Sequence, residues 1–275
     1  MEDLVVSIAL LALTVLGSEA VRRTASRLGG SGEWGLPALL VEFASTFQLC
    51  ACTHELKLLA EQGAVERPLG LTLTYAITVV HVLTFAGAFC NPVAILEQLW
   101  RRHLSWRAAT ARLACQFVAA TGAQLLTPCA WALGLSAVHA RHRAAGFLCR
   151  SSIRTSLFRG ASVELVCALA MQSTLLLTQS LDGRFRVHII AAVITFLVYA
   201  GGSLTGAIFN PVLAFSVQFP CKGHTFLENS FVYWLGPVLG MALSVLIYST
   251  IIPRLSSALG LQKKMDKSEI LKKFN

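Results

Sequence analysis

Two copies of an Asn-Pro-Val motif are the residues of this sequence best suited to do chemistry. The first copy is Asn91-Pro92-Val93 and the second is Asn210-Pro211-Val212. Asparagine is a favoured N-cap and proline a favoured first residue of a helix, so each motif predicts a helix start. An asparagine in this place caps the helix with its side-chain oxygen and keeps its amide N–H groups as hydrogen-bond donors.

Each motif lies in an uncharged run that exceeds the length of one membrane crossing. Residues 69–96 and 187–221 contain no Asp, Glu, Lys or Arg. A spanning helix needs about 20 residues to cross a hydrocarbon core of roughly 30 Å. The longer run therefore predicts a spanning helix and a second element.

The break between these two elements falls at Gly201-Gly202 and the residues that follow. We expect a full span from about Val187, a re-entrant loop, and a half-helix over residues 211–219. The first run repeats this pattern and predicts a half-helix that ends near Trp100. Irregular backbone at membrane depth is tolerated only where it is buried in protein or lines a water-filled cavity.

The composition indicates an integral membrane protein. Hydrophobic residues make up 55% of the chain and charged residues 13%, about half of the share in a soluble domain. This balance excludes soluble enzymes, disordered chains and coiled coils. Six runs can each supply a spanning helix, namely residues 36–53, 69–96, 113–140, 160–181, 187–221 and 229–253.

The 23 Lys and Arg against 14 Asp and Glu give a net charge of +9. The cationic residues form short clusters between apolar runs, which is typical of membrane flanks and cytosolic loops. They do not form the single basic face of a nucleic-acid-binding protein, so we expect no nucleic-acid partner.

The chain contains an internal repeat. Glu42 and Glu164 each lie at the start of a span, and an Asn-Pro-Val motif follows them by 49 and 46 positions. Each half has three spans, with a half-helix after the second, so the halves must insert in opposite orientations. The predicted fold is an all-α membrane protein with six transmembrane helices and two re-entrant half-helices in an inverted 3+3 repeat.

The expected organisation has five segments. They are an N-terminal apolar segment with a basic linker (1–35), a first repeat (36–140), a basic inter-repeat loop (141–159), a second repeat (160–253) and a Lys-rich tail (254–275). The apolar segment is open to three interpretations: a membrane helix, an interfacial helix, or a lead-in to the first span. Glu2 and Asp3 disfavour a signal peptide, which has positive charge at this place. Residues 22–34 are the expected linker.

These motifs resemble the aquaporin, or major intrinsic protein, family over residues 36–253. The resemblance rests on Glu-x-x-x-Thr-Phe at 42–47, the paired Asn-Pro motifs, Gly-Gly-Ser-Leu-Thr-Gly-Ala at 201–207, and Tyr-Trp-Leu-Gly-Pro at 233–237. Both motifs have Val where the orthodox family has Ala. Residues 46–56 and 195–206, together with Cys221, resemble the divergent superaquaporin branch.

The resemblance implies the aquaporin fold, a homotetramer and a passive channel. Asn91 and Asn210 would form a central donor pair at which two half-helices aim their positive ends. Glu42 and Glu164 would brace the re-entrant loops. A proton-coupled transporter that uses Glu164 is the alternative explanation of these intramembrane carboxylates, but their symmetric placement favours bracing.

Other polar residues in the spans are expected to have structural roles. His81, Gln116 and His188 are interpreted as satisfied core residues. Gly236 and Gly240 have the four-residue spacing that suits close helix contact.

The expected selectivity constriction departs from the orthodox pattern. By resemblance, its four positions are Leu71, Val198, Ala207 and Leu213, and Leu213 stands where the family has a pore arginine. An apolar ring offers a permeant few hydrogen bonds and a weaker barrier to cations. We expect slower conduction that is less selective for water, with glycerol or hydrogen peroxide as further permeants.

The last four residues include Lys272 and Lys273, three and four places from the end. On a cytosolic tail this spacing is a dilysine retrieval signal for the endoplasmic reticulum, although a solvated basic tail would show it by chance as well. With six spans both core ends share one side, and the basic residues 101–112 and the tail predict that this side is cytosolic. The basic residues 141–159 would then be lumenal, against that rule.

The favoured function is a passive channel for water, glycerol or hydrogen peroxide in an intracellular membrane. The alternatives are a poorly conducting structural protein of the endoplasmic reticulum with the same fold, and the transporter. No nucleophile–base pair, phosphate loop or metal-ligand cluster occurs in the sequence, so neither enzyme, metal nor cofactor is expected. Cys149 and Cys221 lie in expected loops, and each could be a free thiol or have a partner.

Overall fold

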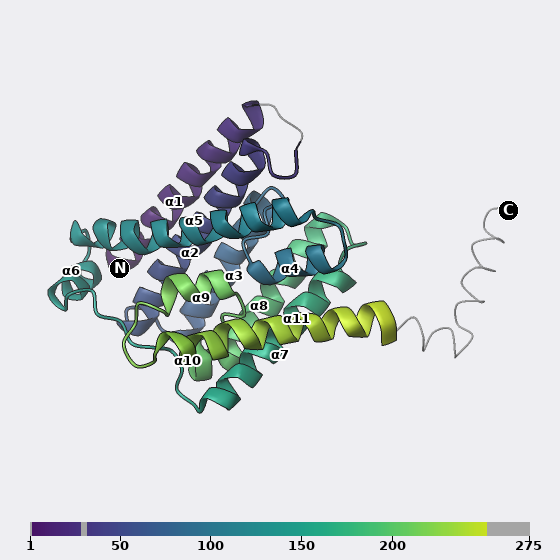
Figure 1. Ribbon diagram of the computed structural model, residues 1–275. Helices are drawn as coiled ribbons and strands as arrows, with labels where there is room; N and C mark the ends of the chain where they lie inside the picture. Colours follow the sequence, from purple (N-terminus) through teal and green to yellow (C-terminus); the bar gives the residue numbers. More distant parts are fainter. Residues whose placement is uncertain (1, 29–31, 252–275) are drawn as a thin grey trace, which may run out of the picture.

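The computed structural model describes residues 2–28 and 32–251 as a bundle of helices (Figure 1). The helices are α1 (Glu2–Arg27), α2 (Leu36–Glu61), α3 (Arg67–Thr84), α4 (Pro92–Trp100), α5 (Trp106–Ala132), α6 (Ala137–Ala144), α7 (Leu157–Leu177), α8 (Gly183–Thr205), α9 (Pro211–Val217), α10 (Phe226–Ser230) and α11 (Gly236–Leu246). Two π-helical segments, Phe231–Leu235 and Ile247–Ile251, extend α10 and α11 into one continuous helix, Phe226–Ile251. Lys272 and Lys273 lie outside the described residues.

Within the described residues, six helices are long and apolar enough to cross a membrane: α1, α2, α5, α7, α8 and Phe226–Ile251. Five of them lie on predicted spans, and the all-α fold class is confirmed. The remaining predicted span, residues 69–96, contains α3, which has only 18 residues and begins with the polar Arg67-Pro68. A seven-residue loop, 85–91, then leads to α4.

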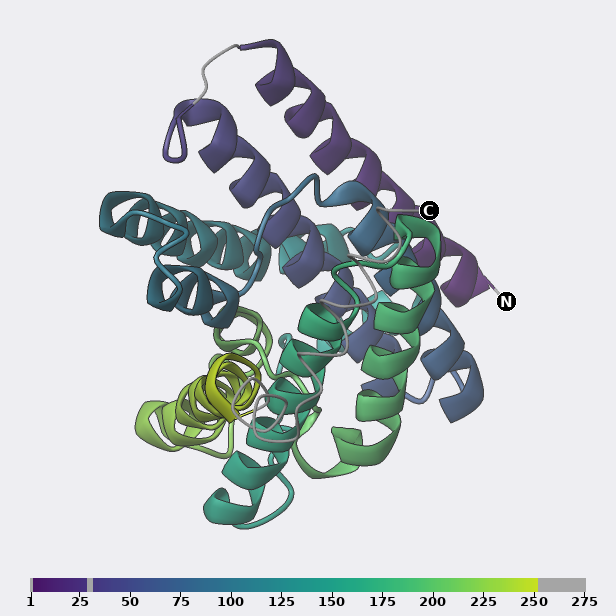
Figure 2. The same ribbon diagram turned by 90° about the vertical axis from the view of Figure 1, so that its right-hand side faces the viewer.

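The two halves pair their helices in the same way. In the first half α2 packs along α5, in the second α7 packs along α11, and α3 packs against α8 across the two halves. Figure 2 shows this bundle from the side of the last span, with α1 and α2 side by side at its upper edge.

Both half-helices begin at the proline of an Asn-Pro-Val motif. They are α4 and α9, and α9 ends at Val217, slightly earlier than the predicted residue 219. The α4 helix packs against α5 and α11, whereas α9 packs against α5, α2 and the segment Phe231–Leu235 of the last span. Each half-helix therefore contacts helices of both halves, and α4 and α9 also contact each other.

Glycine ends the span before the second half-helix. Gly206 has a φ of 90°, a left-handed conformation that glycine adopts without strain, and its N–H donates to the carbonyl of Gly202 (3.0 Å). The chain therefore leaves α8 here and turns into the loop that leads to Asn210.

The N-terminal segment is a 26-residue helix that packs along α2. The expected linker, residues 22–34, is wrong in its first part because α1 continues to Arg27 and Arg22 is buried against α2. The guanidinium group of Arg22 can be buried because Gln48 and Ser45 of α2 accept its hydrogen bonds. The linker between the two helices therefore begins only after Arg27 and ends before Leu36.

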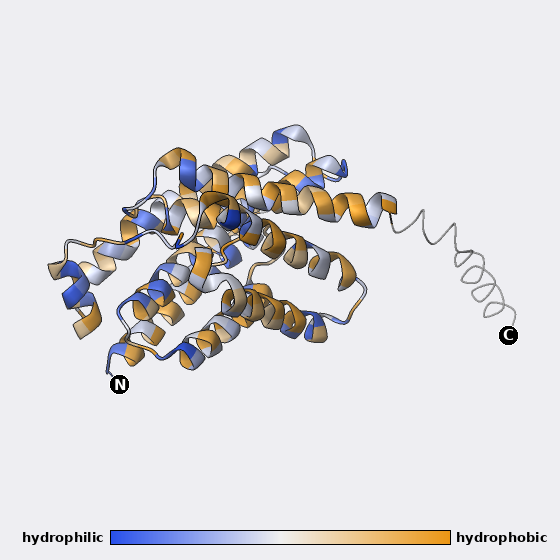
Figure 3. Cartoon of the chain, turned by 90° about the horizontal axis from the view of Figure 1, so that it is seen from below, coloured by the Kyte–Doolittle hydropathy of each residue, from blue (hydrophilic) through white to orange (hydrophobic). Residues whose placement is uncertain are grey.

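The outer surface of the bundle is apolar, as a lipid-facing surface requires. Large hydrophobic side chains such as Leu13, Val118, Phe196 and Leu243 are 40–64% exposed. In Figure 3 hydrophobic residues run along the long helices, most clearly along the helix that leads to the C-terminal trace. An exposed apolar surface of this extent would be unfavourable in water and is favourable in a bilayer.

Candidate functional site

The first Asn-Pro motif places an asparagine at the start of α4. Asn91 is the N-cap of this helix, and its side-chain oxygen accepts from the N–H of Val93 (3.0 Å). Its amide group donates to the carbonyl of Phe209, which belongs to the re-entrant loop of the other half (3.4 Å). The side chain therefore joins its own half-helix to the opposite loop.

The second motif repeats this arrangement in the other direction. Asn210 is the N-cap of α9, and its side-chain oxygen accepts from the N–H groups of Val212 (3.2 Å) and Leu213 (3.3 Å). Its amide group donates to the carbonyl of Cys90 in the first loop (2.8 Å). Each asparagine thus donates to the residue that precedes the other asparagine.

The residues before both asparagines have strained backbone. Cys90 and Phe209 have φ values of 53° and 36°, and Ala207 has a φ of 48°. Left-handed conformations of residues other than glycine are uncommon and persist where surrounding contacts hold them. They turn N–H groups of both loops toward two buried carboxylates.

Glu42 holds the first loop. Its carboxylate accepts from the backbone N–H groups of Cys90 (2.8 Å) and Phe89 (3.1 Å). It also accepts from the guanidinium group of Arg112 and the amide group of Gln116, both at 2.8 Å. The carboxylate is fully buried, and a cation compensates its charge.

Glu164 holds the second loop, and no cation pairs with it in the part of the chain that the structure describes. Its carboxylate accepts from the hydroxyl group of Thr205 and from the N–H groups of Ile208 (3.2 Å) and Phe209. The hydroxyl group of Tyr233 in turn donates to the carbonyl of Thr205 (2.6 Å). Glu164 is fully buried, and the hydrogen bonds that its carboxylate accepts come from residues 205–209, as expected for a carboxylate that braces the loop.

The crossed asparagines leave donors available at the meeting point of the half-helices. A carboxamide has two N–H donors, and the structure uses one of each for the opposite loop. The remaining donors and the positive ends of α4 and α9 can stabilise an electronegative oxygen atom and repel a cation. This arrangement suits a polar neutral molecule.

The four expected constriction residues occupy different surroundings. Leu213 is buried at the start of α9 in a cluster with Cys50 and Val212, whereas Ala207 is buried with Cys167 and Leu197. Leu71 and Val198 are half-buried on α3 and α8, two helices that pack together. Their convergence on one constriction remains a prediction.

The other predicted core residues differ in how well they are satisfied. Gln116 is buried and donates to Glu42, but its side-chain oxygen has no hydrogen-bond partner among the described residues. The prediction is wrong for His188, which is exposed at the surface of α8, where its ring pairs with the hydroxyl group of Tyr75 (2.7 Å). His81 is buried, but its Nε2 atom has no hydrogen-bond partner among the described residues.

Gly236 and Gly240 make the close helix contact that their spacing predicts. A Cβ atom on Gly236 would lie 2.6 Å from the carbonyl oxygen of Ala161, and one on Gly240 would collide with the carbonyl of Leu165. The backbones of α7 and α11 therefore touch, and this prediction is confirmed.

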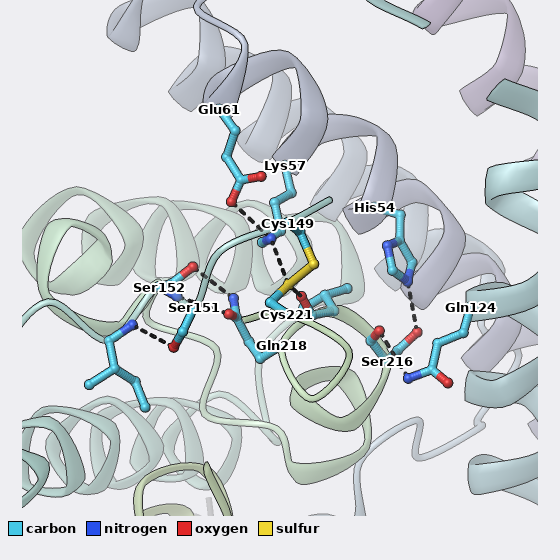
Figure 4. Close-up of a disulfide and its surroundings, with 12 residues drawn as sticks. His54, Lys57, Glu61, Gln124, Cys149, Ser151, Ser152, Ser216, Gln218 and Cys221 are labelled. Atoms are coloured by element: carbon cyan, nitrogen blue, oxygen red, sulfur yellow. Dashed lines mark hydrogen bonds and ion pairs between the residues drawn. A yellow bond between two sulfur atoms is a disulfide. The ribbon is translucent and has the colours of Figure 1, made fainter. Parts of the chain in front are cut away.

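A disulfide joins Cys149 to Cys221, 72 residues apart, beyond the end of α9 (Figure 4). The Nζ atom of Lys57 lies 3.6 Å from the sulfur of Cys221 and pairs with Glu61 (2.8 Å). The sequence left open whether these two cysteines are free thiols or have partners, and in the structure they are bonded to each other. Cys221 matched the branch pattern, whereas Cys149 was marked only by its position in an expected loop.

Residues 149–152 form hydrogen bonds with residues 218–222, which follow the end of α9. The side chain of Gln218 accepts from the N–H of Ser152 (3.0 Å) and donates to its hydroxyl group (2.8 Å), as Figure 4 shows. The backbone of Lys222 bonds Ser151 and Cys149. The basic residues 141–159, unexplained by the sequence, thus include a segment that supports the second half-helix.

The last turn of α9 is tied to the neighbouring helices. The amide group of Gln124 on α5 donates to the carbonyls of Phe215 (2.6 Å) and Ser216 (3.2 Å), and His54 on α2 bonds the hydroxyl group of Ser216 (3.1 Å). Carbonyl groups at a helix end have no partner within the helix, so these contacts satisfy them within the bundle.

Sequence reasoning missed three polar residues that the structure places at or near the site. Arg112 was grouped with cytosolic flank residues, Arg22 with a linker, and Glu55 was not singled out. Glu55 is buried and accepts from Ser7 and from the indole N–H of Trp131 (2.6 Å). A charged residue within a few turns of an apolar span was the available signal for all three.

Known proteins resemble this chain in sequence and in fold. The family described as Major intrinsic protein matches residues 36–248. Aquaporin-11 of Homo sapiens is 42% identical over 227 residues, 82% of this chain and 83% of that protein. Aquaporin-12 of Mus musculus is 36% identical over 259 residues, 93% and 89% of the two chains. These relatives agree with the resemblance to the superaquaporin branch.

A solved structure shows the same fold. The aquaglyceroporin from Plasmodium falciparum superposes with a TM-score of 0.64 at 15% sequence identity, over 80% of this chain and 98% of that chain. The predicted aquaporin fold is therefore confirmed.

Proposed function

The chain belongs to the major intrinsic protein family, the aquaporins, and from this premise we propose that it is a passive channel for water and small neutral solutes. The observation that carries the proposal is the crossed asparagine pair, in which Asn91 and Asn210 bond the opposite loops at the ends of two half-helices. An oxygen of the permeant accepts from the remaining amide donors. The positive ends of α4 and α9 oppose the passage of cations.

The proposed permeants are water, glycerol and hydrogen peroxide. A constriction of Leu71, Val198, Ala207 and Leu213 would carry neither a guanidinium nor an imidazole group. Such a ring admits less polar solutes and conducts water more slowly than a ring with an arginine. The name of the structural neighbour, an aquaglyceroporin, is in line with glycerol as a permeant.

Swelling of reconstituted vesicles tests the channel. Proteoliposomes that contain the purified protein are mixed rapidly with solutions that impose a gradient of water, glycerol or hydrogen peroxide. The rate of the volume change or of solute uptake is compared with that of empty liposomes. We expect Asn210→Asp to lower solute flux or to admit cations, because it adds a negative charge at the asparagine pair. Unchanged flux without cation leak in a folded variant would contradict a pore at this place.

Leu213→Arg tests the constriction separately. The arginine would narrow and polarise the ring, so glycerol and peroxide flux should fall more than water flux. An equal fall of all three would indicate misfolding, and no change would show that Leu213 does not face the permeant.

A poorly conducting structural protein is the second candidate, and the packing of Leu213 favours it. Leu213 is 9% exposed and lies in a cluster of buried hydrophobic residues, so this position leaves little room for a permeant. Vesicles that hold folded wild-type protein and swell no faster than empty ones would favour this candidate.

We propose further that the protein resides in the endoplasmic reticulum membrane as a homotetramer, with a cytosolic C-terminus. Disulfides form in oxidising compartments, so the Cys149–Cys221 side would be lumenal. The helix Phe226–Ile251 starts near this side and would end in the cytosol. Cross-linking of the purified protein tests the tetramer.

The retrieval signal is tested by changing its position as well as its charge. Lys272→Ala with Lys273→Ala should release the protein to later compartments, and so should a few neutral residues appended after Asn275. If the double alanine variant leaves the endoplasmic reticulum and the extended chain stays, the charge of the tail retains the protein, and the interpretation as a dilysine motif is wrong.

A further inference from the structure

An arginine is buried between α1 and α2. Arg22 is 4% exposed, and its guanidinium group donates to the side-chain oxygen of Gln48 (2.9 Å) and the hydroxyl group of Ser45 (3.4 Å). Glu19, one turn earlier on α1, pairs with it at 3.1 Å. Gln48 lies near the middle of α2, so the charge is far from both ends of that span. A buried charge in a membrane segment is costly and indicates a specific role.

The acceptors of Arg22 continue to the first re-entrant loop. The amide group of Gln48 donates to the hydroxyl group of Thr84 (3.1 Å), the last residue of α3. The hydroxyl group of Ser45 lies 3.3 Å from the carbonyl of Phe85, where the loop begins. Two short chains of hydrogen bonds thus connect α1 to the loop that leads to Asn91.

The opposite end of α1 is also bonded to the bundle. Ser7 donates to the buried carboxylate of Glu55, and the carboxylate of Asp3 accepts from the N–H of Val138 (3.2 Å). Glu55 also bonds His139 (3.0 Å). Because Ser7 meets Glu55 and Arg22 meets Ser45, α1 runs antiparallel to α2 over most of its length. Its outer face is apolar, with Val5, Leu13 and Leu16 64–65% exposed.

We propose that α1 spans the membrane in addition to the six spans predicted from the sequence, and that Arg22 is a positioning residue for the first re-entrant loop. The second loop is held in a different way. Within the described residues its contacts come from Glu164 on α7, Thr205 on α8 and Tyr233 in the last span, and α1 does not contribute. Glu42 fixes the end of the first loop that precedes Asn91, and Arg22 fixes its beginning through Gln48 and Ser45. The proposal concerns the position of the loop and does not rest on conduction.

The charges at the two ends of α1 give the orientation of this helix. Arg23 and Arg27 lie at the end beside the start of α2, and Glu2 and Asp3 lie at the other. Cationic residues favour the cytosolic side, so the start of α1 is lumenal.

Hydrogen exchange of the two loops tests the positioning role. The variant Arg22→Met keeps the length of the side chain and removes its donors. We expect the amides of residues 85–91 to exchange about 10- to 100-fold faster, the effect of losing hydrogen bonds to a charged group. The amides of residues 206–210 should exchange at the wild-type rate. Arg22→Lys, which keeps the charge and donors, should restore part of the protection.

The matched control is Arg23→Met. Arg23 pairs with the same Glu19, but its side chain is 73% exposed, so this change should leave both loops unaltered. Faster exchange of both loops in Arg22→Met would show a general loss of stability and overturn the positioning role, as would unchanged exchange of residues 85–91.

A second variant covers the case in which Arg22→Met does not fold. Thr84→Val removes the far end of the hydrogen-bond chain and leaves Arg22 in place. It should accelerate exchange of residues 85–91 alone, and an unaffected loop would overturn the proposal.

Glycosylation tests the spanning role. A tag with an Asn-x-Ser acceptor is placed some 20 residues before Met1 in the full chain. Modification of the tag, which requires a lumenal location, supports seven spans. An unmodified tag that a cytosolic protease removes would overturn it, whatever the vesicle assays give.

Discussion

The two halves of the molecule hold their re-entrant loops with the same acid and different partners. In both, a buried glutamate accepts the N–H groups that precede an asparagine. Glu42 has Arg112 and Gln116 as further donors, whereas Glu164 has the hydroxyl group of Thr205. The comparison indicates that each loop needs a carboxylate acceptor, and that among the described residues only the acceptor of the first half has a compensating cation.

The helices behind the two glutamates differ in a related way. Between α2 and α5 lie the polar side chains of Arg112 and Gln116. Between α7 and α11 the backbones touch through Gly236 and Gly240, which leaves no room for a side chain. The first half is therefore held by a polar network and the second by close packing. Outside these pairs, α1 supports the first half and the Cys149–Cys221 disulfide the second.

The largest expected effect comes from removing the cation of the first half. Arg112→Met leaves the carboxylate of Glu42 buried without its ion pair, which should lower the free energy of unfolding by about 3–5 kcal/mol. Thermal unfolding in detergent measures the loss. The double variant Arg112→Met with Glu42→Gln should recover part of it, because the uncompensated charge is gone. Arg159→Met, an exposed arginine near Glu164, is the control, and an equal loss there would refute the comparison.

The disulfide is expected to act on the second half alone. Cys149→Ser with Cys221→Ser removes a link across 72 residues and should cost about 2–4 kcal/mol. Hydrogen exchange should become faster at the end of α9 and stay unchanged at residues 85–91. Cys129→Ser, a change at an exposed free cysteine, serves as the control. Equal acceleration in both halves would mean that the disulfide stabilises the whole bundle.

Adding one methyl group, by changing glycine to alanine, should have different effects at the close helix contact of the second half and at the looser contact of the first half. Gly240→Ala would place its Cβ atom against the carbonyl of Leu165 and should cost about 1–3 kcal/mol or more. Gly122→Ala in α5 would meet only the ring of Phe47 at 3.7 Å and should be neutral or stabilising. Unfolding temperatures of the two variants measure the difference. Equal temperatures would contradict backbone contact in the second half.

The smallest expected difference lies between the two asparagines. Asn210 accepts from two N–H groups and Asn91 from one, and the donor bond of Asn210 is shorter. Loss of an N-cap costs about 0.5–2 kcal/mol, so Asn210→Ala should lie in the upper part of this range and Asn91→Ala in the lower. Unfolding experiments on both variants measure this order, and the reverse order would show that the second cap is not the stronger.

Features that depend on neighbouring residues were predicted correctly from the sequence. The helix starts at Pro92 and Pro211 follow from the preference of Asn and Pro for these positions, which acts within a few residues. Five of the six predicted spans follow from the length of apolar runs, whereas the run 69–96 holds only the 18-residue helix α3 and part of α4. The repeat follows from the spacing of Glu42 and Glu164 relative to their motifs. The roles of the four constriction residues depend on helix packing and remain predictions.

The membrane class, the half-helices and the repeat were thus predictable from the sequence, because hydropathy and helix capping are local properties. The pairing of Arg112 with Glu42, the pairing of Cys149 with Cys221, and the position of Arg22 in a helix instead of a linker depend on how the helices pack together. These partners are 70, 72 and more than 20 residues apart. Several arginines and cysteines have the chemistry to fill each place, and only the packing of α1, α2, α5 and α9 brings one of them within bonding distance.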